Sequence, residues 1–170
     1  MRRVDAKDPG PQFVHLRLHT EYSLVDGIVR VPRLMRAVAG AGMAAVALTD
    51  HGNLFAMVKF HREAEKRGVK PVIGADLWLS EEDERAEPTR LTLLAQDETG
   101  FRNLTRLVSR SYLEGHARGR PLLARAWLDA ASTAGLIALS GAGEGDVGRA
   151  LVAGRLEEAR VLLDGWLALF

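Results

Sequence analysis

The residues best suited to chemistry in this chain of 170 lie in one short stretch, HLRLHTEYSLVDG, at positions 15–27. Within it, His15, Arg17 and His19 are spaced two residues apart, and the acid Asp26 follows them. Residues two apart on a strand point to the same face, so we predict that these three side chains line one surface. Imidazole and carboxylate groups are typical ligands of a divalent metal, and the stretch therefore indicates a metal site that has been either built or lost.

Other ionisable residues lie near the ends of later predicted strands. Asp50 and His51 end one strand, and Asp76 lies within the next. The carboxyl ends of strands in parallel α/β folds converge on one rim, where ligands and catalytic groups collect. Together with His19, these residues predict a cluster of histidine nitrogens and carboxylate oxygens that suits zinc, manganese or iron.

Each of these residues also has a purely structural interpretation. A backbone carbonyl could satisfy His15, Asp50 could cap a turn or the next helix, and Asp26 could be a simple turn residue. Two further histidines are assigned no chemistry. His61 lies on the apolar stripe of a helix, and His116 lies in a loop rich in glycine and arginine, where it is expected to be exposed.

The elements that must position these residues alternate between short apolar runs and longer segments of helical period. This order predicts parallel strands joined by right-handed crossovers, hence an α/β fold that is either an open doubly wound sheet or a barrel. Five strands are too few to close most α/β barrels. The predicted strands are 13–18, 44–50, 70–79, 90–95 and 135–141.

Helices are predicted where apolar residues recur with a period of about 3.6. In chain order, the stripes consist of Val31, Leu34, Met35 and Val38; of Leu54, Met57, Val58 and His61; and of Leu104, Val108 and Tyr112. A C-terminal stripe consists of Leu156, Leu163, Trp166, Leu167 and Phe170. Because this last stripe ends without glycine, proline or a polar tail, we expect the chain to be a fragment of a longer polypeptide.

Composition excludes several classes of protein. Hydrophobic residues make up 47% of the chain, charged residues 26%, and the net charge is +1, which predicts one soluble globular unit and favours neither nucleic acid nor a membrane. The absence of cysteine excludes disulfides, zinc ribbons and thiol catalysis and fits the cytoplasm. Residues 1–12 lack the apolar segment of a secretory signal and are expected to form a flexible lead-in.

A glycine-rich motif, GEGDVG at 143–148, follows the last predicted strand and matches the GxGxxG pattern of dinucleotide-binding turns. Glu144 and Asp146 would place two negative charges against a pyrophosphate, and this strand is the fifth along the chain, not the first. We therefore predict an ordinary strand-to-helix turn and no nucleotide-binding residues, with a nucleotide-binding module as an alternative.

Four stretches resemble a known family. In order and without large gaps, they are similar to the N-terminal PHP (polymerase and histidinol phosphatase) domain of the bacterial DNA polymerase III alpha subunits of the replicative type. The stretches are FVHLRLHTEYSLVDG, ALTDHGNLFAMVKFHREAEKRGVKPVIGADLWL, RLTLLAQDETGFRNLTRLVSRSYLEG and GLIALSGAGEGDVGRAL. The resemblance implies that residues 13–170 form about the first five strands of a PHP-type distorted (βα) barrel, the remaining strands and the polymerase palm lying beyond Phe170.

The metal-binding pattern of this family is only partly present. Family members with a full cluster read HxH in the first strand, where this chain has Arg17 and then His19. A histidine is also expected at Arg90, and some members offer a further ligand where this chain has Ala142 and Gly143. The resemblance implies that the remaining ligand positions are Asp26, His51 and Asp76, although glutamate is common at the last of these.

Arginine at two ligand positions indicates that the cluster has become structural. A guanidinium stays charged at any relevant pH, repels a divalent metal and pairs with carboxylates in its place. We predict that Arg17 and Arg90 bridge Asp76, Asp50 or Asp26, that no residue of this chain is catalytic, and that no cofactor is required, residual zinc or manganese being the remaining alternative.

Two functions follow from the resemblance. The first is a non-catalytic scaffold that supports a replicative polymerase and docks its proofreading exonuclease subunit, with DNA and magnesium bound by polymerase domains outside this chain and no contact with a membrane. The alternative is an active PHP-type metal-dependent phosphoesterase or 3'-5' exonuclease, in which clustered ions activate water.

Overall fold

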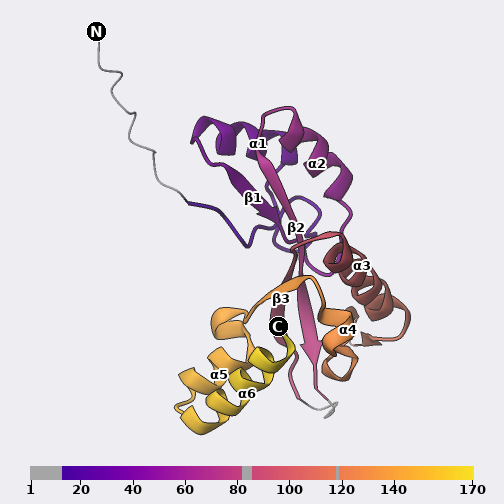
Figure 1. Ribbon diagram of the computed structural model, residues 1–170, viewed down its shortest axis with the longest axis vertical. Helices are drawn as coiled ribbons and strands as arrows, with labels where there is room; N and C mark the ends of the chain where they lie inside the picture. The colour runs from indigo at the N-terminus through magenta and orange to yellow at the C-terminus, as the bar shows by residue number, and fades with distance from the viewer. Residues whose placement is uncertain (1–12, 82–85, 118) are drawn as a thin grey trace.

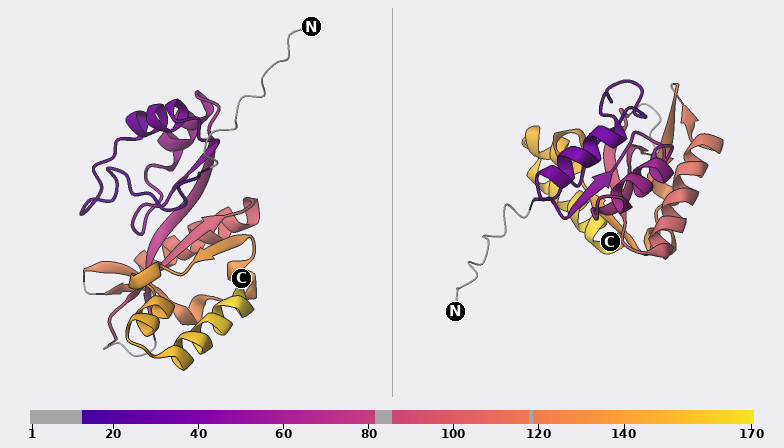
Figure 2. Two further views of the ribbon diagram at one scale, coloured as in Figure 1. Left: turned by 90° about the vertical axis from the view of Figure 1, so that its left-hand side faces the viewer. Right: turned by 90° about the horizontal axis from the view of Figure 1, so that it is seen from above.

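The computed structural model describes residues 13–81, 86–117 and 119–170, so the predicted lead-in at 1–12 lies outside the described residues. The chain folds around one long strand, β2 (Lys70–Ser80), which runs through both halves of the molecule (Figures 1 and 2). Its first residues lie beside the N-terminal elements and its last residues beside the C-terminal ones. Strand β2 therefore connects two regions, each of which has its own core.

In the described part of the chain, the strands form a mixed sheet of six in the order β4-β5-β2-β3-β6, with β1 paired to β2. Strands β1 and β5 run parallel to β2, whereas β3 runs antiparallel to both β2 and β6. The other strands are β1 (Ala45–Leu48), β3 (Thr89–Ala95), β4 (His116–Ala117), β5 (Arg120–Ala124) and β6 (Leu136–Leu139).

The predicted incomplete α/β barrel is confirmed as a mixed α/β fold with an open sheet, but the prediction of parallel strands throughout was wrong. Only residues 81–88 separate β2 from β3, which is shorter than the dozen or more residues of a parallel crossover, so the second strand returns antiparallel. Strands β4 and β5 were missed because β5 is a brief run, RPLLA, that begins beside a glycine and arginine loop.

The predicted strand 13–18 is not a strand, because the chain bends at Leu16 and Arg17. Its carbonyls at His15 and Leu18 accept hydrogen bonds from Ala47 and Thr49 of the β1 region, at 2.8 and 3.0 Å. The segment thus lies along β1 without forming a continuous ladder, and it delivers the residues that follow it to the end of β1.

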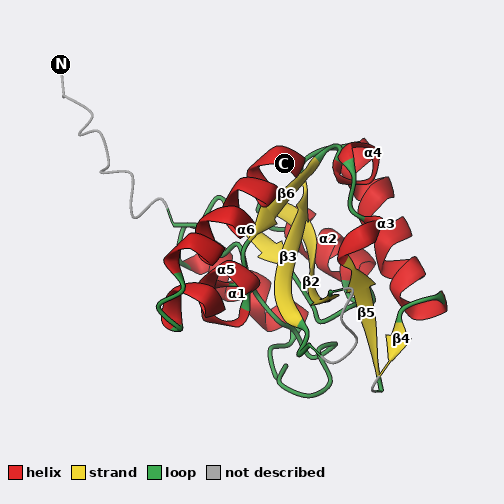
Figure 3. Ribbon diagram, turned by 90° about the horizontal axis from the view of Figure 1, so that it is seen from below, coloured by secondary structure: helices red, strands yellow, loops and turns green. Residues whose placement is uncertain are grey.

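Within the described ranges, six α-helices cover the strands: α1 (Val31–Gly40), α2 (Met57–Glu65), α3 (Glu98–Leu113), α4 (Ala130–Thr133), α5 (Asp146–Val152) and α6 (Leu156–Leu169). Seen from below, α5 and α6 lie on one side of β3 and β6, while α3 and α4 lie on the other (Figure 3). Among the described residues, no helix is long and apolar enough to cross a membrane.

The N-terminal core confirms one predicted helix face and corrects another. Helix α1 has proline in its first turn, where the missing N–H is no loss, and buries Val31, Met35 and Val38 as predicted. Helix α2 instead buries Phe60 and Ala64, because the large aromatic side chain occupies the space against α1 and β1. The buried face of α2 is therefore not the predicted stripe, and Val58, which belongs to that stripe, is 53% exposed.

The C-terminal core packs α3 and α6 against β2, β3 and β6. Helix α3 begins at a capping residue, Asp97, whose side chain accepts a hydrogen bond from the backbone N–H of Gly100 at 2.8 Å. Of the predicted stripe in α6, Trp166 is buried, but Leu156, Leu163 and Leu167 are 66%, 44% and 70% exposed. The apolar pattern of α6 therefore predicted the helix correctly and its buried face only in part.

Phe60→Ala should lower the free energy of unfolding by about 3–5 kcal/mol, because it removes a fully buried ring and leaves a cavity. The matched control in the same helix, Val58→Ala, should change it by less than about 0.5 kcal/mol. Urea denaturation followed by circular dichroism measures both, and equal losses would show that the buried face of α2 has been assigned wrongly.

Candidate metal centre

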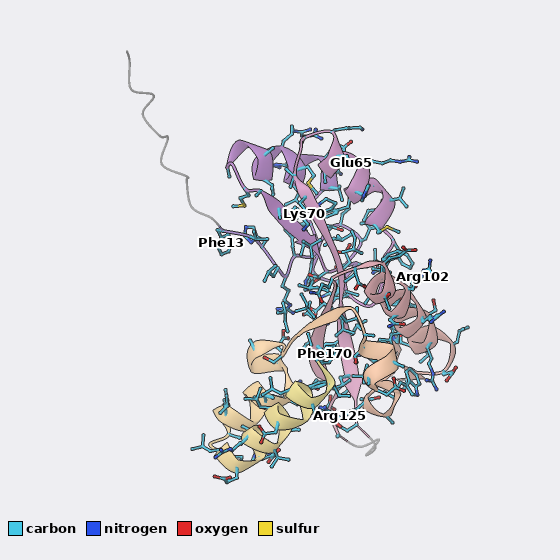
Figure 4. All side chains as sticks on the ribbon, viewed as in Figure 1. Phe13, Glu65, Lys70, Arg102, Arg125 and Phe170 are labelled. Atoms are coloured by element: carbon cyan, nitrogen blue, oxygen red, sulfur yellow. The ribbon has the colours of Figure 1, made fainter. Side chains whose placement is uncertain are left out.

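Asp76 lies at the middle of β2, where two other segments pair with its backbone. The end of β1 reaches it through an isolated bridge between His51 and Asp76, in which Gly52 N–H donates to the Asp76 carbonyl at 2.9 Å. On the other side of β2, Asp76 is paired with Thr92 of β3. Side chains are crowded around this middle part of β2, between the labelled Lys70 and Arg125 (Figure 4).

The Asp76 carboxylate is fully buried and accepts four hydrogen bonds. Its Oδ2 atom accepts from Arg17 Nε and Nη2, at 3.0 and 2.7 Å, and from His19 Nε2 at 2.9 Å. Its Oδ1 atom accepts from the Thr92 hydroxyl at 3.0 Å. A second guanidinium, that of Arg90, has its Nη1 atom 3.8 Å from Oδ2. The buried charge is thus neutralised by arginine.

Asp26 supplies a second carboxylate at the rim of the cluster. Its Oδ2 atom lies 2.8 Å from His51 Nε2 and 3.3 Å from His19 Nδ1. Asp26 is delivered by a tight turn in which the N–H of Gly27 donates to the Ser23 carbonyl at 2.7 Å. A Cβ atom on Gly27 would lie 1.7 Å from the Thr20 carbonyl oxygen, so the turn requires glycine.

His51 is a neutral hydrogen-bonding bridge in this arrangement. Its Nδ1 atom lies 2.6 Å from Arg90 Nη1, and because a guanidinium only donates, Nδ1 accepts. The ring proton is therefore on Nε2, which donates to Asp26. Burial lowers the pKa of His51, and together with the charge of Arg90 it outweighs the opposing hydrogen bond to Asp26, which favours the same neutral form.

The electrostatics of Asp76 are dominated by its partners. Burial alone would raise its pKa, but hydrogen bonds from His19 and Arg17 and the charges of Arg17 and Arg90 outweigh burial and lower the pKa to about 2. Burial also lowers the pKa of Arg90, whose guanidinium stacks over the ring of Trp78 at 3.6 Å from the ring centre.

His19, His51 and Asp76 each offer a ligand atom, and these atoms lie within 4.8 Å of one another, so the three residues could form part of a metal site. The arginines do not fit a divalent metal there. Arg17 Nη2 already lies 2.7 Å from the Asp76 oxygen that a metal would need. Near a protein surface, unit charges 4 Å apart repel by about 4 kcal/mol, and a divalent ion by roughly twice that. As they stand, these residues favour charge pairs over a metal.

The structure brings together the four residues predicted as metal ligands and both arginines. His15 is not among them, because its ring is exposed and contacts Phe13, with 4.8 Å between the ring centres. Asp50 is fully buried but apart from the cluster, and its carboxylate accepts from Thr20 and Ser23, at 2.6–2.8 Å, which fixes the loop that carries Asp26.

Two contributors were missed by sequence reasoning. Thr92 lies two residues after Arg90 on one strand, so period-two alternation could have placed both on the face of β3 that meets Asp76. Glu144 lies in the glycine-rich turn, and its Oε2 atom is 3.2 Å from Arg17 Nη2. Only the fold brings that turn beside Arg17.

Asp76→Asn should make the chain less stable at pH 7 by about 2 kcal/mol, because the pKa of Asp76 falls from 3.8 to about 2 on folding. A lowered pKa means that the charge of Asp76 stabilises the fold above about pH 4 and loses this effect as the pH falls toward 2. The difference in unfolding free energy between wild type and variant should therefore shrink over that range.

Urea denaturation at a series of pH values measures this difference. Asp164→Asn, at an exposed position of α6, provides the control and should follow the wild-type curve. A difference in unfolding free energy between wild type and Asp76→Asn that stays constant from pH 7 to pH 2 would contradict the assigned role of Asp76.

Comparison with known proteins places this chain in a family. The PHP domain model matches residues 15–170. Proteins named DNA polymerase III subunit alpha are similar: that of Pseudomonas aeruginosa is 51% identical over 93% of this chain and 13% of its own length, and that of Escherichia coli K12 is 43% identical over 85% and 12%. The chain thus spans about an eighth of the length of these relatives.

Among solved structures, an amidohydrolase from Chromobacterium violaceum is 20% identical, with a TM-score of 0.45, over 58% of this chain and 32% of its own. The family match covers nearly all the described residues and confirms the resemblance found in the sequence. The chain belongs to the PHP domain family.

Proposed function

We propose that this chain is the N-terminal PHP portion, residues 13–170, of a replicative DNA polymerase of the DNA polymerase III alpha type, and that it serves there as a non-catalytic scaffold in the cytoplasm. The names and identities of the relatives support the first part. One observation carries the second: the guanidinium of Arg17 holds the oxygen of Asp76 that a metal would need.

The charge cluster can do structurally what a metal would do. Arg17 ties the segment after residue 13 to β2, and Arg90 ties β3 to the end of β1 through His51. Asp76 is common to both arginines. Such a network joins several segments of the chain through fixed charges, and it leaves no open coordination position at which water could be activated.

The second candidate function is that of a metal-dependent phosphoesterase or exonuclease. The observation that favours it is the convergence of ligand atoms from His19, His51 and Asp76 within 4.8 Å. For that function both guanidinium groups would have to leave the cluster. When bound, zinc or manganese would supply Lewis-acid activation of water.

The wider role is proposed from the relatives. A replicative polymerase would contact DNA and bind magnesium through regions outside these 170 residues, and we propose that the PHP portion docks the proofreading exonuclease subunit. Size-exclusion chromatography of this chain with a purified exonuclease subunit should give co-elution, and separate elution would contradict docking by this portion alone.

Replacing both arginines by histidine, in the double variant Arg17→His and Arg90→His, should raise zinc or manganese uptake toward one ion per chain. The change removes two positive charges and restores two nitrogen ligands next to His19, His51 and Asp76. Mass spectrometry of metal content, after dialysis against trace metal, measures the uptake.

The matched control is the double variant Arg17→Gln and Arg90→Gln, which removes the same charges and adds no nitrogen ligand, and it should bind much less metal. Stoichiometric zinc or manganese in the wild-type chain would overturn the scaffold proposal. Equal metal content in the histidine and glutamine variants would show that the barrel has diverged beyond simple ligand loss.

A further inference from the structure

The loop that carries Asp26 also exposes three large aliphatic side chains. Leu24, Val25 and Ile28 are 90%, 100% and 91% exposed, and we call them the apolar tip. Single exposed aliphatic residues are common, but three that are almost fully exposed within five positions of one loop are not. The apolar tip lies outside the charge cluster, to which only Asp26 of this loop contributes.

The loop is held in a defined position. Its ends are joined by a hydrogen bond from Glu21 N–H to the Val29 carbonyl at 2.9 Å, and Ser23 donates to the buried Asp50 at 2.8 Å. Glu21 also pairs with Lys59 of α2 at 2.9 Å. The apolar tip is therefore presented in a fixed geometry, which lowers the entropy cost of docking.

An arginine ridge follows the apolar tip directly along the chain. It consists of Arg30, Arg33 and Arg36, all exposed, and the last two lie on the face of α1 opposite its buried residues. Helix α1 contains no acidic residue. Arg30 lies 3.8 Å from Glu21, and among the described residues Arg33 and Arg36 have no ion-pair partner. The ridge is thus a concentrated positive surface.

We propose that the apolar tip and the arginine ridge together form a docking surface for an acidic amphipathic segment of a partner protein. The apolar side chains of that segment would cover Leu24, Val25 and Ile28, and its carboxylates would pair with the ridge. Arginine suits such pairing because its planar group binds carboxylates with two hydrogen bonds.

The surface favours a protein over a membrane or a nucleic acid. Asp26 lies between Val25 and Ile28 in the sequence and has a half-exposed carboxylate, which would be costly to bring among lipid chains together with the tip. Nucleic acid would pair with the ridge through its phosphates but would leave three aliphatic side chains uncovered. The inference depends neither on the state of the metal centre nor on the assignment to a polymerase.

The test uses the full chain and a labelled synthetic peptide of about 20 residues, with leucine on one helical face and glutamate on the other. Fluorescence anisotropy should show saturable binding that weakens as salt rises. Leu24→Ser with Ile28→Ser, and separately Arg33→Glu with Arg36→Glu, should each weaken binding at least tenfold.

The matched control is Arg102→Glu with Arg106→Glu, which reverses two exposed arginines four residues apart on α3. Figure 4 labels the first of them. The control should leave the affinity within about twofold of wild type, since α3 lies apart from α1. Because all these side chains are exposed, thermal unfolding of the tip and ridge variants should match wild type, while the control loses only the exposed ion pair of Arg102 with Glu98. The charge variant at the ridge keeps the test valid if the tip variant fails to fold.

Three results would overturn the proposal. The first is peptide binding that neither pair of variants weakens. The second is equal binding of a peptide with lysine in place of glutamate. The third is tip-dependent binding to phosphatidylglycerol vesicles, or tip-dependent self-association in sedimentation, without binding of the acidic peptide.

Discussion

The buried negative charge of Asp76 is the constraint on which the rest of the structure depends. A carboxylate with no exposed surface is stable in a folded chain only when charges and hydrogen bonds compensate it. Strand β2 places Asp76 where β1 ends and β3 pairs, so the compensating groups must come from those neighbours. Arg17, His19 and Thr92 meet that need directly, and the fold is the arrangement that brings all three to one carboxylate.

Arginine and a metal ion solve this problem in different ways. Either can link carboxylates from distant segments, but a guanidinium is part of the chain and needs no metal supply, and it offers no site for a water or a substrate oxygen. Removing one partner of a buried ion pair typically costs about 3–5 kcal/mol, because it leaves the other charge uncompensated. Without Arg17, the buried charge of Asp76 would keep only His19, Thr92 and the more distant Arg90 as compensating groups.

Local patterns in the sequence predicted those structural features that depend on few neighbouring residues. Strands β1, β2, β3 and β6 are bounded apolar runs, so their type was predictable, and so was the convergence of His51, which follows β1, with Asp76 on the neighbouring strand. The buried face of α2 was not, because Phe60 and Val58 are both apolar and only packing against α1 distinguishes them. Neither was the mixed strand direction, which depends on the path of the connection between β2 and β3.

The glycine-rich turn after β6 shows how sequence and fold combine. By resemblance, this turn stands where some family members offer a further metal ligand, yet here it carries Ala142, whose φ of 48° is a conformation that side chains with a Cβ rarely adopt. That conformation persists in a turn that also delivers Glu144 to Arg17. The turn that could have completed a metal site thus supplies Glu144 as a negative charge for Arg17. The positive charge of Arg17 is therefore paired both at the rim of the cluster, by Glu144, and on β2, by Asp76.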